Sequence, residues 1–344
     1  MSILARFKIA TEAVLLLPFI LRSILLSTKS NYLTPYRVFQ AYKILYLLSR
    51  GYIEILARIL LPPLYCQKVV KQNSLVTASS SLIKYGYAEL SLDIHPLVTD
   101  FLENSHSLPF QSRCTGETIL FQDLSINASG MVGRYDAVSS NLFANTSFAK
   151  IVTSAQIRNL AFSLFGKNAV ITSALAWASF PTFDYSSRSL SSQVYHVDFD
   201  FIDDIKIFIL LSGSSKLNGP IEYIAESHKP WKHKIFSLSG ISDSDVQSCF
   251  DKSRICYFTG SAGSSFISNN RGIHRDYPPS VGHYKVDMQI NLARSRFGDE
   301  YTYLKLLKTR PMLSVEAPSY NVWRDAITRN SMLYSLLFAD PIAK

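Results

Sequence analysis

Two polar residues in the segment SSQVYHVDFD (residues 191–200) have the types and the spacing of metal ligands: His196 and Asp198 stand two positions apart. The segment is typical of a β-strand, in which residues i and i+2 face the same side. Imidazole and carboxylate are the ligand types of the facial triad that holds non-haem iron(II). A lone His-x-Asp pair is common, however, and by itself indicates only a half-exposed strand with polar residues outward. A metal site needs a third ligand from elsewhere in the chain.

The elements that follow offer a way to bring a third ligand back. NGPIEYIAESHK (218–229) is typical of a tight turn, a short strand and a loop. FTGSAGSSFISNNRGIHRDYPPS (258–280) indicates a turn, a strand and then His274 in a polar loop, and HYKVDMQINLA (283–293) indicates another strand. This is the order of elements in a double-stranded β-helix, where a distal histidine returns beside the His-x-Asp pair.

Residues 190–296 resemble the phytanoyl-CoA dioxygenase-like branch of the iron(II)- and 2-oxoglutarate-dependent oxygenases. The matching elements are the pair His196/Asp198, the turn Asn218-Gly219-Pro220 leading to AESH at His228, the distal His274, and the basic residue Lys285. The resemblance implies that His196, Asp198 and His274 bind Fe(II). It also implies that Lys285 pairs with the distal carboxylate of 2-oxoglutarate.

Two positions depart from the family pattern. The family usually carries arginine where this chain has Lys285, and a lysine offers a point charge in place of a planar bidentate fork. Arg294 or Arg296 is therefore an alternative partner for the cosubstrate. Asp276 stands two residues after the distal histidine, where a small hydroxyl residue is common, so part of the cosubstrate's hydrogen bonding is altered here.

Further residues are candidates for contacts at such a site. Gln193 and Tyr195 lie just before the His-x-Asp pair, and Arg134 either reaches the site from an upstream strand or is a solvated arginine. Lys206 either faces the pocket or is a charge at the end of a strand. We expect His228 to be a structural loop residue and not a fourth ligand.

The resemblance implies a 2-oxoglutarate-dependent dioxygenase that consumes O₂, releases succinate and CO₂, and hydroxylates an aliphatic C–H of a small-molecule or lipid-like substrate. Asp198 favours hydroxylation or a related oxidation, since relatives that halogenate typically lack this carboxylate. Two alternatives come from other classes. One is a non-catalytic β-helix that binds a ligand, and the other is a membrane-associated scaffold whose N-terminal helices are the functional part.

The pattern of apolar runs predicts the fold class. Short runs rich in β-branched and aromatic residues recur between 168 and 295, with turn-forming segments between them, which is typical of a sandwich or barrel. A helix is predicted around 150–166, ending at Gly166. We predict a mainly β (α+β) protein with a double-stranded β-helix (jelly-roll or cupin-like) core and N-terminal and peripheral α-helices. With 344 residues and 47% hydrophobic content, the chain can bury a sizeable core.

Three regions are predicted along the chain: a basic, apolar helical segment (1–72), the oxygenase domain with its helical support (82–310), and a C-terminal extension (311–344). Residues 73–81 are interpreted as a polar linker. Of the net charge of +9, residues 1–72 carry +8, from ten Lys/Arg and two Glu. Its apolar stretches (13–26 and 42–63) either pack on the main domain or lie in a membrane interface.

Other features of the sequence limit the kinds of partner and the cellular location that we expect. Basic residues embedded in Leu/Ile-rich helices make a poor reader of nucleic-acid grooves, so no nucleic-acid partner is expected. The cysteines, Cys66, Cys114, Cys249 and Cys256, are scattered with no CxxC pair, which excludes a zinc ribbon and favours reduced thiols. We expect a cytoplasmic protein, with peripheral membrane contact through residues 1–72 as the alternative to packing on the core.

Overall fold

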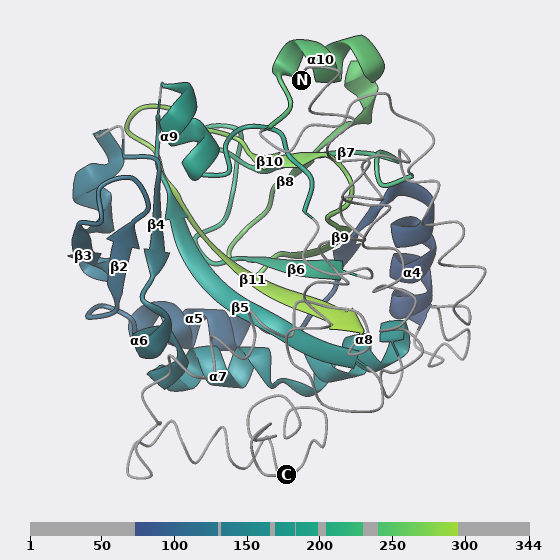
Figure 1. Cartoon of the computed structure of the whole chain (residues 1–344). Helices are drawn as coiled ribbons and strands as arrows, with labels where there is room; N and C mark the ends of the chain where they lie inside the picture. The colour runs from purple at the N-terminus through teal and green to yellow at the C-terminus, as the bar shows by residue number, and fades with distance from the viewer. Residues whose placement is uncertain are drawn as a thin grey trace, which may run out of the picture.

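The computed structural model describes residues 73–129, 132–165, 169–182, 184–198, 204–229 and 240–294 (Figure 1). The predictions made for the N-terminal segment 1–72 and for the extension 311–344 lie outside the described residues.

The described part of the chain combines short helices with antiparallel strands. In chain order these are α4 (Asn73–Tyr85), β1 (Tyr87–Leu90), α5 (His95–Glu103), β2 (Pro109–Ser112), β3 (Thr118–Leu120), η1 (Phe121–Ser129), β4 (Arg134–Ala137), α6 (Ser139–Ala144), α7 (Thr146–Val152), α8 (Ala155–Phe165), β5 (Ala169–Ser179), α9 (Tyr185–Leu190), β6 (Asp204–Leu210), β7 (Ile221–Ile224), α10 (Asp243–Cys249), η3 (Lys252–Arg254), β8 (Ile255–Phe258), β9 (Ser265–Asn269), β10 (His274–Asp276) and β11 (Lys285–Arg294).

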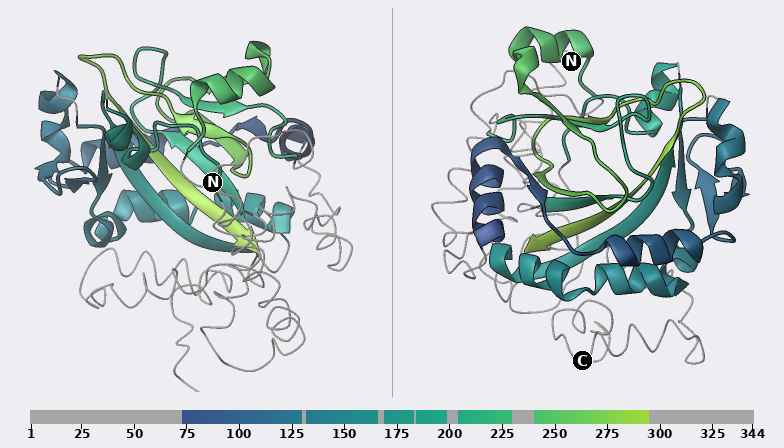
Figure 2. Two further views of the ribbon diagram at one scale, coloured as in Figure 1. Left: turned by 45° about the horizontal axis from the view of Figure 1, so that its top comes forward. Right: turned by 180° about the vertical axis from the view of Figure 1, so that it is seen from behind.

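The strands form two sheets that face each other. The large sheet has the order β1-β9-β6-β11-β5-β4-β2-β3, and the small sheet has the order β10-β7-β8. Helices α5, α7 and α8 lie beneath the large sheet, and α10 lies beyond the small one (Figures 1 and 2). This is the predicted double-stranded β-helix with peripheral helices, so the prediction of the fold class is confirmed.

Alternation along β11 separates an apolar face from a polar one. Val286, Met288, Ile290 and Leu292 are buried in the main core. The residues between them point to the opposite face, toward the small sheet, because side chains alternate along a strand. These residues are Lys285, Asp287, Gln289 and Asn291. A long strand at the centre of the sheet therefore presents charged and amide groups to the space between the sheets.

One end of the space between the sheets is filled by a second apolar cluster. It consists of Trp177, Phe208, Leu210, Ile221, Tyr223, Phe258 and Phe266. The rings of Phe258 and Phe266 stack with centroids 4.7 Å apart, which is within the range of favourable aromatic pairs. Trp177 joins this cluster to the polar groups between the sheets, because its Nε1 donates to Asp276.

Three local predictions were wrong. Residues 73–81 are part of helix α4 and not a linker, since Ala78 and Leu82 are buried in the main core. The helix predicted around 150–166 is two helices, because Ser154 accepts a hydrogen bond from the Ile157 backbone and begins a new one. His274 begins strand β10 and does not lie in a loop.

Within the strand predicted at 191–200, the described residues pair less than expected. Tyr195 and His196 form only isolated bridges, to Ile241 and His274 respectively. Among the helices that the structure describes, none has the length and apolar content needed to cross a membrane.

Candidate metal centre

His196, Asp198 and His274 come together between the two sheets. Each offers one ligand atom, and these atoms all lie within 4.8 Å of one another. His274 Nε2 is 3.3 Å from Asp198 Oδ2, and His196 Nε2 is 3.8 Å from Asp198 Oδ1. The structure thus gathers the three residues that the sequence singled out, from two segments far apart in the chain.

Backbone hydrogen bonds fix the two histidines relative to each other. The His196 N–H donates to the His274 carbonyl at 2.9 Å, and the His274 N–H donates back to the His196 carbonyl at 3.0 Å. The Asp198 N–H donates to the Asn270 carbonyl at 2.8 Å. Main-chain hydrogen bonds therefore hold the three residues next to one another.

The second ring nitrogen of each histidine sets its tautomer. His196 Nδ1 lies 2.8 Å from the Val194 carbonyl, and His274 Nδ1 lies 2.9 Å from the Gly272 carbonyl. A carbonyl oxygen only accepts, so each Nδ1 carries the hydrogen and each Nε2 keeps its lone pair. Both lone pairs are therefore on the nitrogen nearer Asp198. This second contact is the usual way in which metal-binding histidines are oriented.

The protonation states also suit a cation. Burial, together with the neighbouring His274, lowers the pKa of His196 to about 4, so its ring is neutral at physiological pH. Burial opposes ionisation of Asp198, but Lys206 and the two histidines hold the pKa of its carboxyl well below the usual range. Two imidazoles and one carboxylate form a donor set that fits a divalent transition metal such as iron(II).

Two further residues hold Asp198. Lys206 Nζ lies 2.5 Å from Asp198 Oδ2, so Lys206 faces the interior and is not a charge at a strand end. Asn270 Nδ2 donates to the same oxygen at 3.3 Å and lies 3.2 Å from His274 Nε2. The sequence carried no signal for Asn270, which stands four residues before His274 in a turn.

Arg134 and Lys285 lie on either side of Ser179 on the inner face of the large sheet. Both are paired in register with Ser179, from β4 on one side and from β11 on the other. Arg134 is buried and not solvated. Its Nε is 2.7 Å from Asp136 Oδ1, and its guanidinium lies 4.4 Å from the centroid of the Trp177 ring.

Lys285 is wholly buried and already paired with two carboxylates. Its Nζ is 2.5 Å from Asp276 Oδ1 and 2.6 Å from Asp287 Oδ2. Of the alternatives, Arg294 ends β11, about 30 Å along the strand from Lys285, and Arg296 lies outside the described residues. Of the basic residues predicted to bind the distal carboxylate of 2-oxoglutarate, Lys285 is thus the one that lies near the candidate metal centre. Asp276 and Asp287 balance its charge.

The other two predicted cosubstrate contacts, Gln193 and Tyr195, make hydrogen bonds within the protein. Gln193 is buried, and its Nε2 donates to the Phe180 carbonyl at 2.8 Å. The Tyr195 hydroxyl donates to Glu222 at 2.7 Å and its ring stacks on Arg275, on the side of the small sheet away from the metal centre. Alternation explains this, because Tyr195 directly precedes a residue that faces inward. His228 contacts the Ile83 carbonyl at 3.1 Å, as expected of a structural residue.

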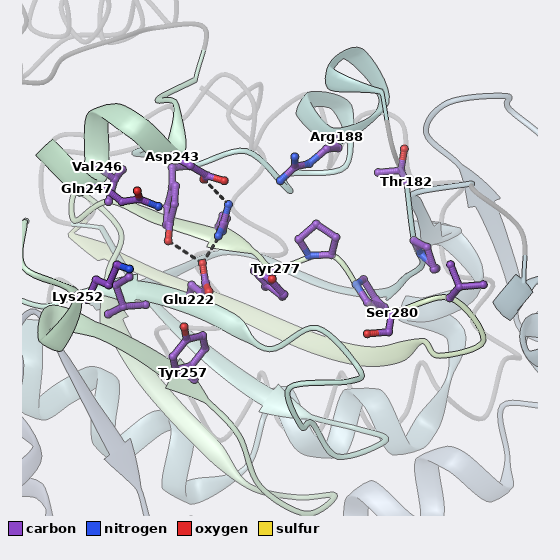
Figure 3. Close-up of a pocket in the computed structure, with 17 residues that line it drawn as sticks. Thr182, Arg188, Glu222, Asp243, Val246, Gln247, Lys252, Tyr257, Tyr277 and Ser280 are labelled. Atoms are coloured by element: carbon purple, nitrogen blue, oxygen red, sulfur yellow. Dashed lines mark hydrogen bonds and ion pairs between the residues drawn. The ribbon is translucent and has the colours of Figure 1, made fainter.

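A cavity of about 660 Å³ opens on that outer face, between the small sheet and α10 (Figure 3). Three of its charged groups, Arg275, Glu222 and Asp243, pair with one another. Arg275 Nε is 2.5 Å from Glu222, and its Nη1 is 2.6 Å from Asp243 (Figure 3). These contacts hold β10 from behind, so that His274 and Asp276 are directed inward.

Comparisons with known proteins give structural likenesses only. No family model matches the sequence, and no curated protein matches it significantly. The similar solved structures include EctD from S. alaskensis with 2-oxoglutarate and 5-hydroxyectoine (15% identity, 70% of this chain and 86% of that one, TM-score 0.46). They also include the non-heme alpha ketoglutarate dependent epimerase SnoN (12%, 64% and 82%, TM-score 0.44) and the non-heme monooxygenase ThoJ with nickel (12%, 76% and 99%, TM-score 0.40). Likeness at this level leaves the function to be argued from the site's own residues.

Proposed function

We propose that the protein is an iron(II)- and 2-oxoglutarate-dependent oxygenase whose metal is bound by His196, Asp198 and His274. The observation that carries the proposal is the pair of imidazoles whose Nδ1 atoms contact backbone carbonyls and whose Nε2 atoms lie beside the half-buried Asp198 carboxylate. Three ligands on one side of an octahedral ion leave open positions for a cosubstrate and O₂.

Iron held in this way supplies the oxidative decarboxylation of 2-oxoglutarate to succinate and CO₂, coupled to oxidation of a substrate C–H bond. The protein's own residues position and shield that chemistry. Lys206 and Asn270 fix the Asp198 carboxylate, and the apolar cluster around Phe258 excludes water from one end of the interior. Hydroxylation, and the narrower likeness to phytanoyl-CoA dioxygenase-like enzymes, are parts of the same proposal.

The inner face of the large sheet favours a small polar substrate over a long acyl chain. Gln289 and Asn291 face inward on β11, and Lys206 lies in register with Asn291 on the neighbouring strand. Amide and charged groups recognise polar functional groups and are costly to bury against hydrocarbon.

A metal-binding β-helix without turnover is the second candidate. The observation in its favour is Lys285, whose charge is already met by two aspartates. Both candidates bind a metal at the same residues. They differ in whether 2-oxoglutarate then binds and is turned over.

A metal titration tests the shared part. Purified protein is titrated with Co(II), and the visible absorption of the bound ion is followed. We expect one ion per chain, and we expect His274→Ala to weaken binding by about 100-fold or more, because second-shell changes alone cost 10–100-fold. The exposed His106→Ala is the matched control and should bind like the wild type. Equal binding by His274→Ala would exclude the proposed centre.

An anaerobic titration with Fe(II) and excess 2-oxoglutarate tests the oxygenase itself. A weak visible charge-transfer band that is lost in His274→Ala, followed by succinate release on admission of O₂, is the expected result. Metal binding without either signal at saturating 2-oxoglutarate would favour the non-catalytic candidate.

A further inference from the structure

The acidic residue two positions after the distal histidine lies where an incoming carboxylate would need to be. Asp276 extends from β10 across to the large sheet, where it contacts residues of both β5 and β11. Lys285 is 0% exposed, so no part of its ammonium group is open to the interior. A ligand can reach this cation only by displacing a carboxylate that the chain provides.

The contacts of Asp276 form a complete carboxylate site. Oδ1 pairs with Lys285 Nζ at 2.5 Å. Oδ2 accepts a hydrogen bond from Trp177 Nε1 at 3.0 Å and another from the Ser179 hydroxyl. One buried cation and two neutral donors around a carboxylate make charge-assisted hydrogen bonds of the strong kind.

We propose that Asp276 is a built-in competitor for the distal carboxylate of 2-oxoglutarate at Lys285, so that the chain holds its metal but binds the cosubstrate weakly. The inference rests on the proposed function. The physical basis is that one carboxylate replaces another. A ligand carboxylate that displaces Asp276 gains the contacts that Asp276 loses, so the free energies of the two sets of contacts largely cancel. Lys285 therefore adds little to the affinity for 2-oxoglutarate, because the net free energy of a hydrogen bond depends on the interactions that it replaces.

Asp287 is a second carboxylate partner of Lys285, and it makes a test by substitution of Asp276 possible. It lies 2.6 Å from Lys285 on the same strand face. After removal of Asp276, Lys285 therefore keeps one buried carboxylate partner, and the variant avoids an unpaired buried charge. The space vacated beside Trp177 and Ser179 then becomes available to a ligand carboxylate.

The experiment measures the dissociation constant of 2-oxoglutarate by calorimetry on Co(II)-loaded protein. We expect Asp276→Ser to bind about tenfold or more tightly than the wild type, the scale of one charge-assisted hydrogen bond. The double variant Asp276→Ser/Lys285→Ala should lose that gain. Asp243→Ser is the matched control, because it removes an ion pair from the outer face of β10 without touching Lys285, and it should match the wild type.

Pyruvate is the second probe, since it shares the 1-carboxylate and 2-oxo group of 2-oxoglutarate and lacks the distal carboxylate. Its affinity should be the same in the wild type and in Asp276→Ser. An equal gain for both ligands would mean a general loosening of the site and would overturn the inference. Unchanged 2-oxoglutarate affinity in Asp276→Ser, whether tight or absent, would overturn it as well.

If Asp276→Ser does not fold, Asp276→Asn keeps the size of the side chain and removes its charge. We then expect a smaller gain in the same direction, and no gain contradicts the inference. Failure of the proposed function is distinct, because it would appear as loss of Co(II) binding by the wild type before any 2-oxoglutarate is added.

Discussion

Asp287 shows how burial alters a single ionisable group. It is fully buried beside Lys285, with Asp276 and Arg134 close enough to act on its charge. Burial raises the pKa of Asp287 from its ordinary 3.8 to about 6, against the opposing pull of Lys285. Because the folded pKa exceeds the unfolded one, the associated stability is present below about pH 4 and is lost as the pH rises through about 6.

We therefore expect Asp287→Asn, which cannot ionise, to gain stability relative to the wild type as the pH rises from 4 to 7. The difference between the two free energies of unfolding should shift by up to about 2 kcal/mol over that interval. Urea unfolding of both proteins at several pH values measures it, and titrations common to both proteins cancel. A difference that is constant with pH, or that grows toward acid, would contradict the assignment.

The order of elements along the chain and the resemblance to a known family predicted the meeting of His196, Asp198 and His274. They did not reveal which carboxylates satisfy Lys285, because sequence gives positions along a strand and not the partners facing them from another sheet. One signal was available: Lys285 and Asp287 stand two apart in an otherwise apolar strand, which puts opposite charges on one face. For Asp276, sequence suggested altered hydrogen bonding but not its pairing with Lys285.

Strand β10 is short, and groups on both of its faces hold it. On the outer face, Arg275 is 7% exposed and Glu222 is 2% exposed, and their ion pair is joined by the Tyr195 hydroxyl. Removing one partner of a buried pair leaves the other charge uncompensated, which costs far more than losing an exposed pair.

We expect Glu222→Ala to lower the free energy of unfolding by about 3–5 kcal/mol. Asp243→Ala removes the other carboxylate from Arg275, but this side chain is 52% exposed, so its loss should cost about 1 kcal/mol or less. Chemical denaturation of the two variants side by side gives the comparison. Equal losses would show that the outer network does not stabilise the small sheet.

The strands were easier to predict than the helices. Runs of β-branched and aromatic residues marked β5, β6, β7, β8, β9 and β11 closely. Helix α4 was missed because its sequence NSLVTASSSLIKY is rich in serine and threonine, which have modest helix propensity. Its buried Ala78 and Leu82 show that tertiary packing decides its conformation, as it does for most helices in proteins.

At the scale of the whole molecule, charge and chemistry are separated along the chain. Residues 1–72 hold nearly all of the net charge, whereas the three proposed metal ligands and their hydrogen-bond partners all come from positions 194–274. We therefore propose that the role of residues 1–72, packing or membrane contact, is independent of the proposed metal-binding residues.

A variant lacking residues 1–72 is therefore expected to bind Co(II) with the affinity of the full chain. Flotation with anionic liposomes then assigns the segment's role. Full-length protein that floats while the shortened variant does not would establish a membrane contact, and full-length protein that stays in the soluble fraction would favour packing on the core. A loss of metal binding in a folded shortened variant would contradict the separation.

The reciprocal backbone bonds between His196 and His274 bear on when the metal enters. They close a long loop, so part of the entropic cost of bringing the two histidines together is met by these main-chain bonds. In this the centre differs from a zinc finger, which is unfolded until its metal arrives. If His196 and His274 bind a metal as proposed, the two backbone bonds therefore share with the ion the work of bringing these side chains together.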